Sequence, residues 1–143
     1  LKEAALQSDI IVTCSPAKEP YLKKEYVAQG TFIAAMGADS PDKNEIDVRL
    51  LAGSNLVVDL PEQCAAVGEL HHALDAGLMI REDIYATLGE LASNRKPGRL
   101  SDQDIFIFDA TGTAIQDAAA AAFCYEKALQ RGVGTFVNLD SAV

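Results

Sequence analysis

Four short apolar segments recur along the chain, and each is followed within a few residues by a turn-forming residue. They cover residues 10–13, 31–36, 56–58 and 105–108, and we expect each to form a buried strand. The stretches between and after them have a helical pattern. Parallel strands need crossover connections of this kind, so the pattern predicts an α/β fold with a doubly wound parallel sheet.

The expected helices differ in strength. Residues 113–131 form the clearest one, an alanine-rich run between Gly112 and Gly132. Shorter helices are expected over residues 1–7, 22–27 and 47–52, the last with Asp47 as its N-cap. Residues 62–94 are predicted to be mostly helical, and residues 95–98 to form a loop. Because doubly wound sheets bind ligands at the carboxyl ends of their strands, segments 13–16, 37–43 and 109–113 become candidates for a site.

Composition excludes several classes of function. The net charge of −9 disfavours binding to nucleic acid and to anionic membranes, although backbone N–H groups could still hold a dinucleotide. No apolar run approaches the roughly 20 residues that a membrane span requires. Because the chain opens inside an expected helix without a start methionine, we expect it to be part of a longer protein.

Cysteine and histidine residues indicate no metal site. Cys14, Cys64 and Cys124 are far apart, which favours free thiols in a reducing, cytoplasmic compartment, with Cys124 in the core. His71 and His72 are adjacent on an expected helix and would face different directions, so we interpret them as surface groups or local hydrogen bonders.

The segment Met-Gly-Ala-Asp-Ser-Pro-Asp-Lys, residues 36–43, is the richest in candidate chemistry. Gly37 would let a ligand approach the backbone closely, and Asp39 follows at once. A partly desolvated carboxylate beside a cofactor is suited to proton transfer. A plain turn is the alternative, because Asp, Ser and Pro are ordinary turn formers, and Lys43 alone would then be a surface lysine.

The segment Asp-Ala-Thr-Gly, residues 109–112, lies between an expected strand and the long helix. Exposed N–H groups at the start of that helix could hold an anion or another polar ligand. Helix capping by Asp109 or Thr111 is the alternative.

Several separated motifs resemble the ornithine cyclodeaminase / mu-crystallin family. They are SDIIVTCSPAKEPYLKKEYVAQGTFIAAMGADSPDKNEID, GELHHALDAG, DIYATLGELASNRKPGR and IFIFDATGTAIQDAAAAAFCYEKAL. The resemblance implies that residues 1–108 form part of an NAD(P)-binding Rossmann domain. It also implies that residues 109–143, including the long helix, return to a substrate and dimerisation domain of a homodimer.

The resemblance also implies roles for single residues. Asp39 matches the catalytic aspartate, which also contacts the substrate, and Thr111 matches a position that lines the substrate pocket. The matched cofactor-contacting positions are Thr13, Met36, Gly37, Ala38, Asp39, Lys43 and Ala110. Ala110 replaces the usual serine, so that contact could be made only by the backbone.

The chemistry implied is hydride transfer at the α-carbon of an amino acid. In ornithine cyclodeaminase, NAD⁺ takes a hydride from ornithine, ammonia leaves, and the hydride returns to give proline. Relatives instead reduce cyclic imines such as pyrroline-2-carboxylate, or act as alanine dehydrogenases. NAD and NADP both fit, because the residue that distinguishes them would lie upstream of Leu1. NAD is slightly favoured.

Two other hypotheses stand beside an active enzyme. One is a non-catalytic binding protein similar to mu-crystallin, which lacks the aspartate that this chain keeps at Asp39. The other is an inactive, truncated gene product.

Overall fold

The computed structural model describes residues 1–137 of the chain. Its helices are α1 (Lys2–Leu6), α2 (Val48–Leu51), α3 (Pro61–Val67), α4 (Glu69–Asp75), α5 (Leu88–Ala92) and α6 (Ala114–Arg131), with short 3-10 helices at Lys24–Tyr26 and Arg81–Asp83. Its strands are β1 (Ile10–Thr13), β2 (Phe32–Ala35), β3 (Asn55–Val58), β4 (Ala86–Thr87) and β5 (Phe106–Asp109).

The strands form a five-stranded sheet in the order β1-β2-β5-β3-β4. Every pairing is parallel, and β5 lies between β2 and β3 although it comes last in the chain. The carboxyl ends of all the strands therefore meet at one edge. This confirms the prediction of an α/β, Rossmann-like parallel sheet followed by a C-terminal helix.

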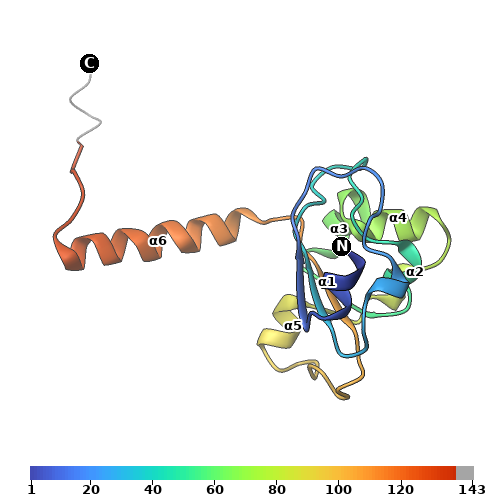
Figure 1. Ribbon diagram of the computed structural model, residues 1–143. Coiled ribbons are helices and arrows are strands. Elements are labelled where there is room, and N and C mark those ends of the chain that lie inside the picture. The colour runs from blue at the N-terminus through green and yellow to red at the C-terminus, as the bar shows by residue number, and fades with distance from the viewer. Residues whose placement is uncertain (138–143) are drawn as a thin grey trace. The chain divides into compact units, whose positions relative to one another are not determined.

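One face of the sheet carries the core. Ile33 of β2, Leu56 of β3 and Ile107 of β5 have no exposed surface. They belong to one apolar cluster with side chains from the helices, among them Leu50 of α2 and Leu70 of α4. Figure 1 shows α2, α3 and α4 next to one another along this side of the domain.

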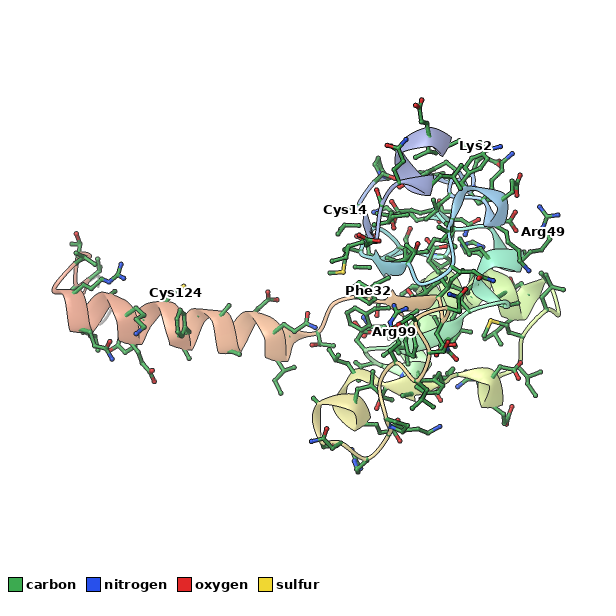
Figure 2. All side chains as sticks on the ribbon, turned by 60° about the horizontal axis from the view of Figure 1, so that its bottom comes forward. Lys2, Cys14, Phe32, Arg49, Arg99 and Cys124 are labelled. Atoms are coloured by element: carbon green, nitrogen blue, oxygen red, sulfur yellow. The ribbon has the colours of Figure 1, made fainter. Side chains whose placement is uncertain are left out.

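The opposite face is only partly covered. Near α5, Val57 and Phe106 are buried, but Ile10 and Val12 of β1 are 67% and 63% exposed. The prediction that residues 10–13 form a buried strand is therefore right about the strand and wrong about its burial. β1 is an edge strand with one covered face, and apolar side chains alone do not show which face is covered. Phe32 and Arg99 lie together at an open hollow on this side (Figure 2).

Two predicted helical segments are corrected. Over residues 22–27 only a 3-10 turn forms, because the backbone of Leu22 pairs with that of Glu45 and Asp47 instead. Over residues 62–94 the helices α3, α4 and α5 are short, and the missed strand β4 adds to the edge of the sheet beside β3. The N-cap prediction for Asp47 is confirmed, since its carboxylate accepts from the Arg49 N–H at 2.8 Å.

The chain divides into two compact units, residues 1–112 and a unit that begins at Thr113. Within the second unit α6 buries none of its residues, so the prediction that Cys124 lies in the core is wrong. Cys124 is labelled on α6 in Figure 2. The assignment of residues 109–143 to a substrate and dimerisation domain stays a prediction, and residues 138–143 lie outside the described residues. No helix in the described part is long and apolar enough to cross a membrane.

Candidate functional site

The ends of β1, β2 and β5 lie side by side at the carboxyl edge of the sheet. The N–H of Met36 donates to the carbonyl of Thr13 at 2.8 Å, and the N–H of Ala110 donates to the carbonyl of Ala35 at 3.0 Å. The structure thus brings together the three segments that the sequence singled out. Thr13 is the last residue of β1, and the other candidate site residues lie in the segments that follow β2 and β5.

Asp39 and Lys43 form an ion pair in the loop after β2, with Lys43 Nζ 2.6 Å from Asp39 Oδ1. The Asp39 side chain is 63% exposed and that of Lys43 is 25% exposed. The expected partial desolvation of Asp39 refers to a carboxylate beside a bound cofactor, so it stays a prediction. The Asp39 carboxylate is accessible to a ligand at this edge and has a cation beside it.

The backbone that leads to Asp39 is firmly held. Gly37 and Ala38 are buried, whereas the Met36 side chain is half exposed. The Thr13 side chain is only 3% exposed, and its hydroxyl makes no hydrogen bond of normal geometry within the described residues. The hydroxyl lies close to the buried Glu45 carboxylate and is among the groups that lower the pKa of that acid.

Glu45 is a buried carboxylate that sequence reasoning missed. It accepts hydrogen bonds from the N–H and hydroxyl of Ser15, from the Tyr21 hydroxyl, and from the N–H of Gly37. Burial alone would raise its pKa, but these hydrogen bonds, that of Ser15 foremost, outweigh burial and the pKa is lowered. Its signal in the sequence is weak, a glutamate between Asn44 and Ile46.

Glu69, at the start of α4, holds the segment that contains Glu45 by hydrogen bonds. Its carboxylate accepts from the side chain of Asn44 and from the N–H groups of Glu45 and Ile46. Burial, more than any other cause, raises the pKa of Glu69 to about 7. Glu69 therefore ties the loop that carries the candidate site to α4.

Asp109 is a second buried acid, at the end of β5. Its carboxylate accepts from the N–H of Leu70 at 2.9 Å, and a Cβ on Gly68 would lie only 2.6 Å from it. Asp109 thus caps α4 rather than the long helix, whose N-cap is Thr113. Burial raises the pKa of Asp109 to about 6. The capping alternative for Asp109 and Thr111 is wrong for α6, because these side chains turn to partners elsewhere in the fold.

Asp59, just past β3, holds the segment after β5. Its carboxylate accepts from the N–H groups of Thr111 and Gly112, both at 2.9 Å, and from the Thr111 hydroxyl at 3.1 Å. The N–H groups that the sequence offered to an external anion are therefore taken by a carboxylate of the chain. Thr111 faces Asp59 here, and its predicted contact with substrate stays a prediction.

The histidines and Cys14 lie around this region without forming a metal centre. One ring nitrogen of His72 lies 2.7 Å from the carbonyl oxygen of Lys43, so α4 also contacts the loop of the ion pair. A ring nitrogen of His71 lies beside the carbonyl oxygen of Ala65, which is near it in the sequence. Cys14 is exposed at the end of β1 (Figure 2). Among the described residues no group of three or more possible ligands gathers around one point.

A parallel sheet with candidate polar groups at its carboxyl edge defines a Rossmann-like domain of the nucleotide-binding class. A model of the ornithine cyclodeaminase/mu-crystallin family matches residues 1–132. The chain belongs to that family.

Three similar proteins indicate the range of activities among the relatives of this chain. Alanine dehydrogenase of Archaeoglobus fulgidus is 46% identical over 95% of this chain and 42% of its own length. A solved archaeal alanine dehydrogenase dimer with bound NAD matches with a TM-score of 0.88 and 44% identity, over 96% of this chain and 43% of that one. The Δ1-pyrroline-2-carboxylate reductase of Thermococcus litoralis, solved with NADH and L-proline, matches with a TM-score of 0.90 and 35% identity, over 95% of this chain and 42% of that one.

A structure of a probable ornithine cyclodeaminase from Bordetella pertussis is more distant. It matches with a TM-score of 0.79 and 29% identity, over 94% of this chain and 44% of that one. The chain thus spans less than half the length of the relatives that it matches.

Proposed function

We propose that the full-length protein transfers a hydride between a nicotinamide cofactor and the α-carbon of an amino acid or its imine. The observation that carries this proposal is the accessible Asp39–Lys43 pair at the carboxyl edge of the parallel sheet. The cofactor would supply the hydride chemistry. The side chains of this chain would bind it, orient it and move the accompanying proton.

The residues fit such a cofactor in kind. Met36 offers an exposed apolar surface to a flat ring, Lys43 offers a cation, and Thr13 would contact the cofactor at the end of β1. Ala110 lies at the same edge and could contribute only backbone. NAD(H) is the first choice, since the solved alanine dehydrogenase and pyrroline-2-carboxylate reductase contain NAD and NADH.

Asp39 would be the proton carrier at the substrate nitrogen, and Thr111 would line the substrate pocket. The Asp39 carboxylate is accessible at this edge, so it could accept a proton from the substrate nitrogen and return it. Because Asp39 is present, a catalytic role is favoured over that of a non-catalytic binding protein. We also propose that the protein works as a homodimer, as the solved archaeal relative does.

Oxidation of an amino acid or reduction of a cyclic imine is the favoured reaction. Identity is 46% with an alanine dehydrogenase and 29% with a probable ornithine cyclodeaminase. The cyclodeaminase activity that the family name suggests is therefore the second candidate. Both would use the same carboxylate and the same cofactor edge.

A substrate panel tests this proposal. The full-length protein is assayed with alanine, pyrroline-2-carboxylate and ornithine, each with both cofactors, while NAD(P)H absorbance and ammonia are followed. Alanine oxidation would give NADH and ammonia together, and imine reduction would consume NADH without ammonia. Ornithine cyclisation would release ammonia with no net change in NADH, because the hydride returns. We expect one of the first two patterns, and no turnover in any arm would contradict the proposal.

Replacing Lys43 by alanine tests the cofactor contact. Loss of one charged hydrogen bond should weaken NADH binding about tenfold, which a fluorescence titration would measure. Lys18→Ala is the matched control, since Lys18 also forms a 2.6 Å ion pair, with Asp42, but at an exposed position. Equal affinities of wild type and Lys43→Ala would make Lys43 a partner of Asp39 only.

A further inference from the structure

The Glu45 carboxylate lies between two of the loops at the candidate site. Its Oε1 atom accepts from the Ser15 N–H at 2.6 Å, the Ser15 hydroxyl at 2.7 Å and the Tyr21 hydroxyl at 2.9 Å. Its Oε2 atom accepts from the Gly37 N–H at 3.1 Å. One oxygen thus holds the segment that follows β1, and the other holds the turn that follows β2.

The fit between Glu45 and Gly37 leaves no room for a side chain. A Cβ on Gly37 would lie 2.5 Å from the Glu45 carboxylate carbon and equally close to Oε2. The sequence predicted that a ligand would closely approach the backbone of Gly37. In the structure the Glu45 carboxylate makes such an approach. The Glu45 side chain has no exposed surface, and its hydrogen bonds keep it ionised, so the contact is both tight and directional.

We infer that Glu45 is a positioning residue for the proposed reaction: it sets the Gly37 turn, and through that turn the place of Asp39, relative to the end of β1. This inference rests on the proposed function. Asp39 is two residues beyond Gly37 in the loop, and within residues 1–137 its side chain is held only by the ion pair with Lys43. The backbone before it must then supply the precision that hydride and proton transfer need, since a misplacement of about 1 Å can cost on the order of a hundredfold in rate.

Glu45→Gln in the full-length protein separates the two oxygens. The amide oxygen can still accept from Ser15 and Tyr21, whereas the amide nitrogen then faces the Gly37 N–H, donor against donor. The turn should shift while the β1 side stays in place. We expect kcat to fall about tenfold to a hundredfold. The unfolding midpoint should also fall, because two buried donors that face each other leave a hydrogen bond unmade. The dissociation constant of NADH should change much less than kcat.

Two further variants show whether the effect is one of positioning. Tyr21→Phe removes one donor from the Oε1 side and should lower kcat less than Glu45→Gln does, again with a smaller effect on cofactor affinity than on kcat. Glu90→Gln is the control, because Glu90 also accepts from a backbone N–H and a hydroxyl, both of Thr87, but does so at the start of α5. It should change the unfolding midpoint at most and leave kcat as in the wild type.

The outcomes separate this inference from the function on which it rests. No wild-type turnover with any panel substrate contradicts the proposed function. Wild-type turnover with an unchanged kcat in Glu45→Gln contradicts only the role of Glu45. If Glu45→Gln and Tyr21→Phe lower the cofactor affinity by as large a factor as they lower kcat, Glu45 is a structural carboxylate and the inference is also wrong.

Discussion

Asp39→Asn in the full-length protein is expected to lower kcat by about a hundredfold to ten-thousandfold. The substitution keeps the size and shape of the side chain but removes its capacity to carry a proton. Asparagine can still accept a hydrogen bond from Lys43, so the dissociation constant of NADH should stay close to that of the wild type. Steady-state kinetics with the preferred substrate, together with a fluorescence titration of NADH, measures the two effects separately.

The matched control for this experiment is Asp42→Asn, in the same loop. Asp42 also pairs with a lysine at 2.6 Å, and its side chain is 65% exposed, close to the 63% of Asp39. A general loss of charge or of an ion pair in the loop would affect both variants alike. Full activity in Asp39→Asn would remove this residue from the mechanism, and a large loss in Asp42→Asn would move the proton carrier along the loop.

The stability of the protein is expected to fall as the pH rises from 5 to 8. Burial raises the pKa of Glu69 from 4.5 to about 7 and that of Asp109 from 3.8 to about 6. The folded state therefore binds protons that the unfolded state has already released. For each group the contribution to stability is fully present below its unfolded pKa and is lost as the pH rises through its folded pKa. Each loss is about 3 kcal/mol.

Asp109→Asn identifies which acid is responsible. Asparagine does not titrate, so the variant should lose the contribution of Asp109, which acts between about pH 4 and 6, and keep a contribution of Glu69, which extends up to about pH 7. The measurement is the thermal unfolding midpoint of the full-length protein at a series of pH values. Wild type and variant are compared by the slope of the midpoint against pH and not by its absolute value. A wild-type midpoint that rises between pH 5 and 8 would contradict the raised pKa values of both acids.

Local pattern was sufficient for much of the fold. The β-branched and aromatic runs located β1, β2, β3 and β5 to within a residue or two, and the alanine-rich run located α6. Strands that alternate with helices implied parallel pairing, which in turn placed Thr13, Asp39 and Ala110 at one edge. All of this depends on neighbours close in the chain, which a sequence displays directly.

The support beneath the site depends on contacts that are distant in the chain. Glu45 meets Ser15 thirty residues away, Asp109 meets Leu70 thirty-nine residues away, and Asp59 meets Thr111 fifty-two residues away. From the sequence these acids look like ordinary surface or turn residues. Whether a carboxylate is buried depends on donors that other segments bring to it, and no local pattern contains that information.

The sequence alone determined the parallel α/β architecture, the family, and the loop that carries Asp39. Only the tertiary structure decided the strand order, the face of β1 that is covered, and the use of Glu45, Glu69, Asp59 and Asp109 as internal anions. The reason is physical: secondary structure follows from the periodicity of neighbouring side chains, whereas the burial of a charge follows from which distant N–H and O–H groups the folded chain points at it.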